Sequence, residues 1–359
     1  SLLLLVSIGC KHTNPRLSGK AKMEVTEHTF LSERHQTYYR ACGPEHGPLI
    51  IMTHGWPELS ISWRHQLSFL GDMGYRAVAP DMRGYGGSSI YAEHSAYSQR
   101  EIVKDMIELI DGLGREKAVW IGHDWGSPVA WNVALHHPER VAAVASLCVP
   151  FGFSGRPEGL EYAINRKLYP ADEYPAGQWD YQLFYYENFV KAQEEMEENP
   201  ERVAKLLFRK GDPNGQGKIA ATALTRKNGG WFNLIGGVPD AQQDYDVVTD
   251  QDIATYAKHL TENGFFGPNS WYVNGDANQA YFDEKSDLTL SMPALFVHAT
   301  YDYVCDTTTT GFAEPMRELC KNLTEKRLDC GHWMAQEKAA ELNEILSNWL
   351  SDQAVYPAL

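Results

Sequence analysis

Short apolar runs of strand type alternate with segments of helical period over the first part of the chain, and this alternation limits the fold more than any other feature. In residues 102–113, for example, Ile102, Met106 and Ile110 lie on one helical stripe. Strands that alternate with helices favour a parallel sheet covered by helices on both faces. The sequence therefore predicts an α/β fold with a mostly parallel, doubly wound sheet. Strands are expected at residues 49–53, 75–80, 118–121, 141–148 and 293–297, helices at 102–113, 127–135, 307–319 and 335–350, and an antiparallel hairpin at 23–41.

The alternation stops after Pro150. From there to about Asp287 the chain is rich in Tyr, Trp, Glu, Gly and Asn and contains helical stretches but no convincing buried strand. The strand–helix pattern then resumes and continues into a terminal amphipathic helix. We therefore predict a core formed by residues 21–150 and 288–359, a helical cap inserted at residues 151–287, and an N-terminal tail at residues 1–20.

The segment Gly122-His123-Asp124-Trp125-Gly126 follows an expected strand and precedes an expected helix. This is the small-x-nucleophile-x-small pattern of a nucleophile elbow, in which glycines permit a sharp and strained turn. The central residue is Asp124, where most enzymes with this elbow have Ser. A carboxylate is ionised at neutral pH and can displace a leaving group from saturated carbon, which gives an alkyl ester on the enzyme. The predicted substrates are therefore epoxides or alkyl halides, not carboxylic esters or peptides.

Hydrolysis of such an ester needs donors that hold the oxyanion formed when water attacks. The segment His54-Gly55-Trp56-Pro57 ends a strand at the edge where the elbow is expected. The backbone N–H groups of Trp56 and Trp125 are therefore predicted to form the oxyanion hole. The two indole rings are also suited to wall an apolar pocket, and both uses are compatible. Pro57, after an aromatic residue, is a candidate for a cis peptide bond.

The water that attacks the ester also needs a base. His332 lies in a Cys-Gly-His-Trp loop before the last expected helix and is the predicted base. Asp302 follows the last expected strand and is the predicted acid that orients the imidazole. The chain order Asp124, Asp302, His332 is the nucleophile–acid–base order of a fold with this elbow. Asp306 is the alternative acid, and a helix cap near Thr307 is an alternative use for these carboxylates.

Six segments between about residue 23 and the C-terminus carry distinctive motifs. They are His54-Gly55-Trp56-Pro57, Asp81-Met82-Arg83-Gly84-Tyr85-Gly86-Gly87-Ser88-Ser89, Gly122-His123-Asp124-Trp125-Gly126, Asp180-Tyr181-Gln182-Leu183, Gly267-Pro268-Asn269-Ser270-Trp271-Tyr272 and Cys330-Gly331-His332-Trp333. Together they resemble the soluble epoxide hydrolases of the α/β-hydrolase superfamily. Residues 1–16 are not required by the family pattern, and residues 157–178 do not map onto it.

This resemblance implies a cofactor-independent hydrolase that converts a small apolar epoxide and water into a vicinal diol. In the family, two cap tyrosines hydrogen-bond the epoxide oxygen, and Tyr181 and Tyr272 match their positions. The opened epoxide is an alkoxide, a poor leaving group, to which a phenol can donate a proton. Trp56 and Trp125 would complete the substrate-binding wall. Tyr181 stands among other aromatic residues, so core packing is its alternative role.

Two other functional classes remain as alternatives. A haloalkane or haloacid dehalogenase shares the Asp nucleophile, but a halide leaves without protonation and is held by N–H donors. Dehalogenases typically have Asn, Glu or Phe at the position of Trp56, which disfavours this alternative. A non-catalytic binding module that kept the fold would usually lack a member of the triad, and none is missing here.

Composition excludes some partners. Lys and Arg total 32 against 47 Asp and Glu, a formal net charge of -15, so phosphate backbones should be repelled and no nucleic-acid partner is expected. The six cysteines are scattered, without a CxxC pair or a His at zinc-ligand spacing, so no structural metal is expected. Their spacing does not assign a disulfide. No segment has the apolar length of a membrane span.

The first residues allow two interpretations. Leu2 to Ile8 is apolar, and Gly9-Cys10 after it resembles a lipoprotein cleavage site. An export signal would predict a periplasmic, secreted or lipid-anchored protein, with the anchor at Cys10. The alternative is a short apolar strand or helix packed on the core of a cytoplasmic protein, because no basic segment precedes the apolar run.

Overall fold

An eight-stranded sheet forms the centre of the computed structural model, which describes residues 22–152 and 156–356. The strand order is β1-β2-β4-β3-β5-β6-β7-β8. The pairs β1–β2 and β2–β4 are antiparallel and all other neighbours are parallel, which confirms the predicted mostly parallel sheet. The strands are β1 (Thr26–Leu31), β2 (Gln36–Cys42), β3 (Leu49–Thr53), β4 (Arg76–Pro80), β5 (Ala118–His123), β6 (Val141–Leu147), β7 (Leu290–Ala299) and β8 (Cys320–Leu328).

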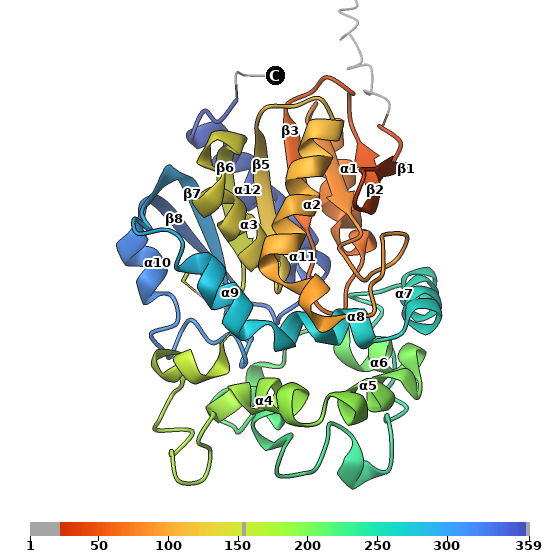
Figure 1. Cartoon of the computed structure of the whole chain (residues 1–359), viewed down its shortest axis with the longest axis vertical. Helices are drawn as coiled ribbons and strands as arrows, with labels where there is room; N and C mark the ends of the chain where they lie inside the picture. Colours follow the sequence, from red (N-terminus) through yellow and green to blue (C-terminus); the bar gives the residue numbers. More distant parts are fainter. Residues whose placement is uncertain (1–21, 153–155, 357–359) are drawn as a thin grey trace, which may run out of the picture.

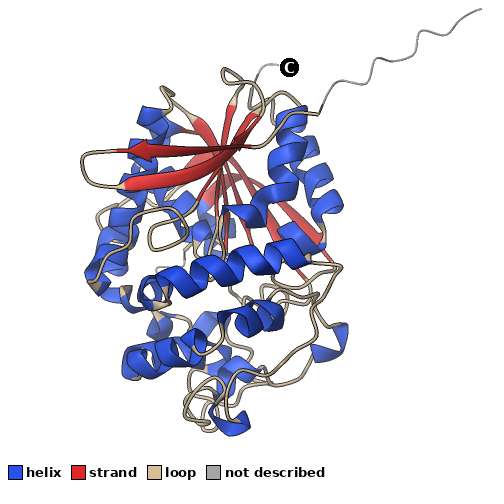
Figure 2. Cartoon of the chain, turned by 90° about the vertical axis from the view of Figure 1, so that its right-hand side faces the viewer, coloured by secondary structure: helices blue, strands red, loops and turns tan. Residues whose placement is uncertain are grey.

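Helices cover both faces of this sheet. One pair of packed helices, α2 and α3, lies on one face, while α1 and α12 pack together on the other (Figure 1). Figure 2 shows the twisted strands running between these two layers. The core helices are α1 (Arg64–Asp72), α2 (Gln99–Gly112), α3 (Gly126–His136), α10 (Glu314–Leu319), α11 (Met334–Glu337) and α12 (Ala339–Asp352).

The degree to which a strand is buried determines whether its sequence is a continuous apolar run. Every residue of β3 and β5 is buried, because both strands lie inside the sheet beneath helices, and their sequences are continuous apolar runs. In contrast, β8 is an edge strand, and only its first and last residues are buried. Its sequence CKNLTEKRL is therefore polar, and the expected pattern did not include it.

One predicted helix was wrong in extent. Residues 307–319 were expected to be helical, but α10 begins only at Glu314. The Asp306 carboxylate accepts hydrogen bonds from the backbone N–H groups of Thr308 and Thr309, both at 2.9 Å, and this stabilises a turn in place of a helix. The terminal helix also divides, into α11 and α12 at Lys338.

The segment between β6 and β7, which we call the cap, contains no strand among its described residues (148–152 and 156–289). Figure 1 shows it as a separate layer below the sheet, with α8 and α9 next to the core and α4, α5 and α6 beneath them. Its helices are α4 (Asp180–Glu187), α5 (Phe189–Glu197), α6 (Pro200–Leu207), α7 (Asp250–Asn263), α8 (Phe266–Ser270) and α9 (Gly275–Phe282).

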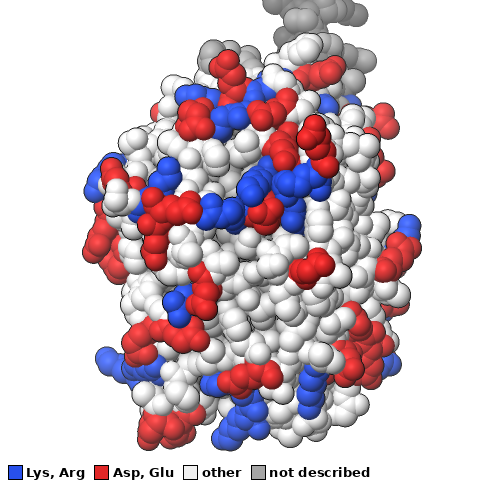
Figure 3. Space-filling model, viewed as in Figure 1, with Lys and Arg blue, Asp and Glu red and all other residues white. Residues whose placement is uncertain are grey.

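Three further observations concern the surface and the termini. On the face drawn in Figure 3, acidic and basic side chains lie next to one another and form no separate basic area. None of the helices in the described part of the chain is both long and apolar enough to span a membrane. The predicted anchor at Cys10 lies outside the described residues.

Candidate active site

Asp124 lies at the sharp turn between β5 and α3. Its φ angle is 51°, a left-handed conformation that is costly for a residue with a side chain. The flanking glycines are needed for close packing: a Cβ atom at Gly126 would lie 2.1 Å from the carbonyl oxygen of Thr53. The predicted elbow is therefore present in its expected geometry.

The backbone of the loop that follows β3 reaches the same carboxylate. The amide N–H of Trp56 donates to Asp124 Oδ1 at 2.7 Å. A Cβ atom at Gly55 would lie 2.3 Å from Asp124 Oδ1 and 2.6 Å from the amide nitrogen of Trp125, so the loop approaches the elbow as closely as glycine allows. The Trp56–Pro57 peptide bond is cis, as predicted. The structure thus brings both predicted oxyanion-hole residues to the nucleophile.

His332 lies between the two predicted carboxylates. Its Nε2 is 3.2 Å from Asp124 Oδ2, and its Nδ1 donates to Asp302 Oδ2 at 2.5 Å. Burial alone would lower the pKa of His332, but the charge of Asp302 and the hydrogen bond to Asp124 outweigh it and raise the pKa well above 6.5. Burial would raise the pKa of Asp302, but the charge of His332 keeps it below its usual value.

The two candidate acids take different positions. Asp302 is 5% exposed, and its second oxygen accepts the backbone N–H groups of Val304 and Cys305 at 3.1 and 3.0 Å, which fixes the carboxylate toward His332. The Asp306 carboxylate instead accepts the hydrogen bonds of the threonine turn described above. The structure therefore favours Asp302 over Asp306 as the partner of the imidazole.

Both predicted tyrosines project from the cap toward the elbow. Tyr181, from α4, lines a small cavity together with Asp124 and Trp125. Tyr272 lies in the 3₁₀ turn after α8, and its ring centroid is 5.3 Å from that of Trp125 and 5.7 Å from that of Tyr181. Both phenols are buried, and burial raises the pKa of each well above 10. They therefore stay protonated at neutral pH and can donate hydrogen bonds.

Comparisons of this chain with a family model and with known proteins agree on one family. Residues 48–339 match the model of the alpha/beta hydrolase fold. Epoxide hydrolase A of Mycobacterium tuberculosis is 33% identical over 317 residues, which are 86% of this chain and 92% of that protein. The chain belongs to the epoxide hydrolase family of α/β-hydrolases.

Two further epoxide hydrolases are similar to this chain. The crystal structure of epoxide hydrolase A from Mycobacterium thermoresistibile has a TM-score of 0.74 and 31% identity, and covers 91% of this chain and 98% of that chain. The bifunctional epoxide hydrolase 2 of Sus scrofa is 37% identical over 313 residues, or 87% of this chain. The chain spans about half (53%) of the length of this pig relative.

A buried ion pair lies next to the site and contacts the backbone on both sides of it. The sequence did not predict this pair. His123 donates from Nδ1 to Glu58 Oε1 at 2.6 Å and from Nε2 to the backbone carbonyl of His332 at 2.7 Å. Both ring nitrogens face acceptor oxygens, and although burial lowers the pKa of His123, the charge of Glu58 raises it to about 10, so His123 is an imidazolium at neutral pH. Glu58 Oε1 also accepts the N–H of Gly55 at 3.1 Å. In this epoxide hydrolase family member, one charge pair therefore connects the oxyanion-hole loop to the backbone of the predicted base. The sequence signal is weak: Glu58 merely follows Pro57.

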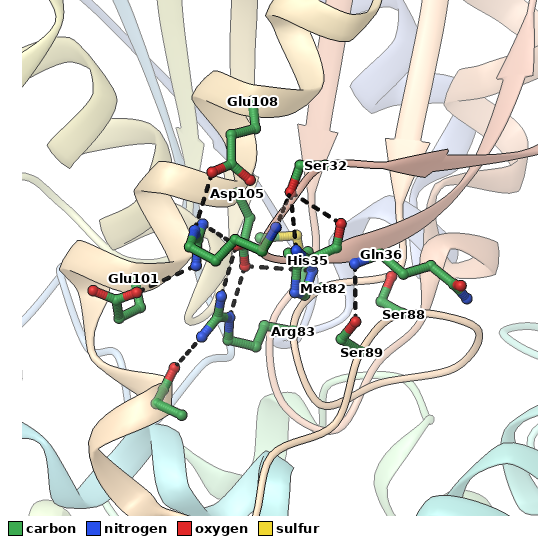
Figure 4. A network of polar contacts seen from close by, with 12 residues as sticks. Ser32, His35, Gln36, Met82, Arg83, Ser88, Ser89, Glu101, Asp105 and Glu108 are labelled. Atoms are coloured by element: carbon green, nitrogen blue, oxygen red, sulfur yellow. Dashed lines mark hydrogen bonds and ion pairs between the residues drawn. The ribbon is translucent and has the colours of Figure 1, made fainter.

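A second network fixes the loop after β4 (Figure 4). Arg83 donates from Nε and Nη2 to the two oxygens of Asp105, each at 2.8 Å, and Arg34 donates to the same carboxylate at 2.6 Å. The backbone carbonyl of Arg83 accepts the indole N–H of Trp271 at 3.1 Å. Because Trp271 precedes Tyr272, this buried network fixes the surface on which the tyrosine segment rests.

Two groups of potential metal ligands among the described residues share His332. One contains His123 and Cys148, the other Asp302 and Cys305, with ligand atoms within 4.8 Å of one another. The imidazole nitrogens of His123 and Nδ1 of His332 already donate hydrogen bonds, so they have no lone pair for a cation. Burial also raises the pKa of the Cys305 thiol, which keeps it protonated. These groups fit the catalytic constellation better than a metal site.

Proposed function

We propose that this protein hydrolyses epoxides to vicinal diols through a covalent ester on Asp124. The observation that supports this most directly is the surroundings of one carboxylate. Asp124 contacts the Trp56 amide and the His332 imidazole, and it shares a cavity with the Tyr181 phenol. A nucleophile, a base and an acid for the leaving oxygen thus meet at one point, as the family membership leads us to expect.

In the first step, the two oxygens of Asp124 have different roles. Oδ1 is held by the Trp56 amide at 2.7 Å, whereas Oδ2 faces His332 Nε2 at 3.2 Å, and we assign Oδ2 as the oxygen that attacks an epoxide carbon. A new C–O bond forms to Oδ2, the C–O bond of the epoxide breaks, and the alkoxide takes a proton or hydrogen bonds from Tyr181 and Tyr272. Tyr181 lines the same cavity as Asp124, and the ring centroid of Tyr272 lies 5.7 Å from that of Tyr181, so both phenols are placed near the nucleophile.

In the second step, His332 acts on water. Once Asp124 is an ester, its negative charge is gone, and one of the interactions that raise the pKa of His332 is lost with it. His332 then gives its proton to the phenolate left by the first step, and the neutral imidazole accepts a proton from water, which attacks the ester carbonyl carbon. Oδ1 becomes the oxyanion, stabilised by the amides of Trp56 and Trp125, and each such donor typically lowers the barrier by about 3–4 kcal/mol. Asp302 stabilises the imidazolium that forms. The tetrahedral intermediate then collapses: the bond between the carboxyl carbon and Oδ2 breaks, the diol oxygen takes the proton from His332, and Asp124 is again a carboxylate.

A single-turnover reaction in ¹⁸O water tests this mechanism with a panel of epoxides. The first diol should carry unlabelled oxygen, because the inserted oxygen comes from Asp124. In the His332→Gln variant the ester should form but not break down, and intact-protein mass spectrometry should show an increase equal to the mass of the epoxide. Label in the first diol would mean that water attacks the epoxide directly, and the mechanism would be wrong.

Tyrosine variants separate this activity from dehalogenation. Tyr181→Phe and Tyr272→Phe should each strongly reduce the rate of epoxide opening, because the alkoxide loses a proton donor. A halide leaves without protonation, so a dehalogenase would keep its rate in both variants. Rapid turnover of haloalkanes by the parent protein, unchanged by either substitution, would contradict the proposal.

A further inference from the structure

The hydroxyl of Tyr181 has a polar neighbour that the mechanism above does not use. Gln182 follows Tyr181 in α4, is 2% exposed, and lines the same cavity as Asp124. Its amide Nε2 donates to the Tyr181 hydroxyl oxygen at 3.2 Å. A buried amide that points into the substrate cavity and contacts the acid of the reaction is placed to affect the chemistry.

A phenol hydroxyl has one proton and can accept hydrogen bonds on its oxygen. With the Gln182 amide donating to that oxygen, the proton of Tyr181 is left to point elsewhere. No other hydrogen bond to this hydroxyl is present within residues 22–152 and 156–356, so the side facing the cavity is available for the proton.

Resting on the epoxide hydrolase function proposed above, we propose that Gln182 is a positioning residue. Its amide N–H holds the Tyr181 oxygen and turns the phenol's proton toward the epoxide oxygen. The amide is held by this contact alone, since its carbonyl oxygen Oε1 is buried without a hydrogen-bond partner among the described residues.

The same hydrogen bond makes Tyr181 a better acid. Burial raises the pKa of Tyr181, and the hydrogen bond from Gln182 acts in the opposite direction because it stabilises the phenolate. Tyr272 has no such donor among the described residues, so the two phenols are not equivalent. Loss of the Gln182 amide should therefore affect the part of the reaction that depends on Tyr181 and leave the part that depends on Tyr272.

Two substitutions test the direction of the hydrogen bond. Gln182→Met keeps an unbranched side chain of similar length but removes the amide, and should slow alkylation of Asp124 by about 5- to 10-fold. Gln182→Glu, assayed at a pH high enough to ionise the buried carboxyl group, supplies a carboxylate that only accepts and so would hold the phenol's proton away from the substrate. It should slow alkylation more than Gln182→Met. The rate is measured in a single turnover with styrene oxide and is divided by the fraction of enzyme that becomes alkylated, which removes any contribution from misfolded protein.

Tyrosine backgrounds show whether Gln182 acts through Tyr181. In the Tyr272→Phe background, Gln182→Met should reduce the rate of Asp124 alkylation by the same factor as in the parent protein. In the Tyr181→Phe background it should cause no further reduction. Within each tyrosine background, Gln182→Met should not change the rate of ester hydrolysis further, because that step depends on His332. A general structural role predicts equal costs in both backgrounds and slower hydrolysis, and either result would overturn the proposal, as would a Gln182→Glu variant that alkylates faster than Gln182→Met. If the epoxide hydrolase function itself is wrong, no alkyl-enzyme will form even in the parent protein.

Discussion

The buried pair of Glu58 and His123 allows a prediction with a magnitude. Their side chains are 2% and 1% exposed. Burial lowers the pKa of His123, but the charge of Glu58 outweighs it and raises the pKa to about 10. Burial raises the pKa of Glu58, but the charge of His123 outweighs it and lowers the pKa to about 2. Both groups are therefore charged at neutral pH. Removal of one partner from such a pair typically costs about 3–5 kcal/mol, so Glu58→Gln should lower the free energy of unfolding by this amount.

The pH dependence of this loss has a defined sign. The folded-state pKa of His123, about 10, lies above its value of 6.5 in the unfolded chain, so the pair stabilises fully below pH 6.5 and loses this contribution as the pH rises to 10. The folded-state pKa of Glu58, about 2, lies below 4.5, so stability is also lost as the pH falls from 4.5 to 2. The two shifts describe one interaction and are not summed. The difference between parent and Glu58→Gln should be largest near pH 6 and should shrink toward pH 10.

Urea unfolding followed by tryptophan fluorescence at pH 6, 8 and 9.5 measures this difference. Glu139→Gln is the matched control, because Glu139 faces His137 at 3.7 Å with side chains that are 64% and 35% exposed. An exposed pair of this kind contributes below about 1 kcal/mol. If Glu58→Gln costs no more than Glu139→Gln at pH 6, or if its cost grows toward pH 10, the buried-charge argument is refuted.

Three further predictions concern the site. Asp302→Asn should slow ester hydrolysis by about four orders of magnitude, since an amide cannot stabilise the imidazolium of His332, and the alkyl-enzyme should accumulate in mass spectra; an unchanged steady-state rate would make another group the acid. Gly126→Ala should lower the free energy of unfolding by at least about 1–3 kcal/mol, because its Cβ atom would meet the Thr53 carbonyl at 2.1 Å, and urea titration checks this against the parent. Asp306→Asn should leave the rate of ester hydrolysis close to that of the parent in rapid-quench experiments, because its carboxylate stabilises a turn.

The parts of the fold that the sequence predicted are those whose physical signal is local. Buried strands such as β3 and β5 are continuous apolar runs, and the glycines around Asp124 report the strained turn directly. The edge strand β8 was missed because one of its faces and its edge meet solvent, so it lacks an apolar run. The expected helix at residues 307–319 was too long because hydrogen bonds from a threonine turn to Asp306 compete with helix formation.

The residues of the candidate site also fall into two groups: those that local sequence features predict and those that only the structure reveals. Asp124, Asp302 and His332 could be found because their types, order and neighbouring elements are visible in the chain. Glu58 and His123 could not, because the evidence for their role is a contact between positions 65 residues apart. His123 occupies an x position of the small-x-nucleophile-x-small pattern, which assigns it no role. Gln182 belongs to a motif that the sequence shows, but its contact with the Tyr181 hydroxyl is visible only in the structure.

Two imidazoles of different kinds meet beneath the substrate cavity, with ring centroids 4.8 Å apart. His123 is charged in every state, because both of its nitrogens donate and Glu58 stays ionised. The charge of His332 depends on the state of Asp124, because Asp124, the proposed nucleophile, is one of the two carboxylates that contact the imidazole. Alkylation neutralises that carboxylate, while the fixed charge of His123 continues to oppose protonation of its neighbour. His332 is thus held protonated while Asp124 is a carboxylate, and only after the ester forms is its pKa low enough for the imidazole to be neutral and to accept a proton from water. The charges around the site therefore favour the proposed order of the two steps.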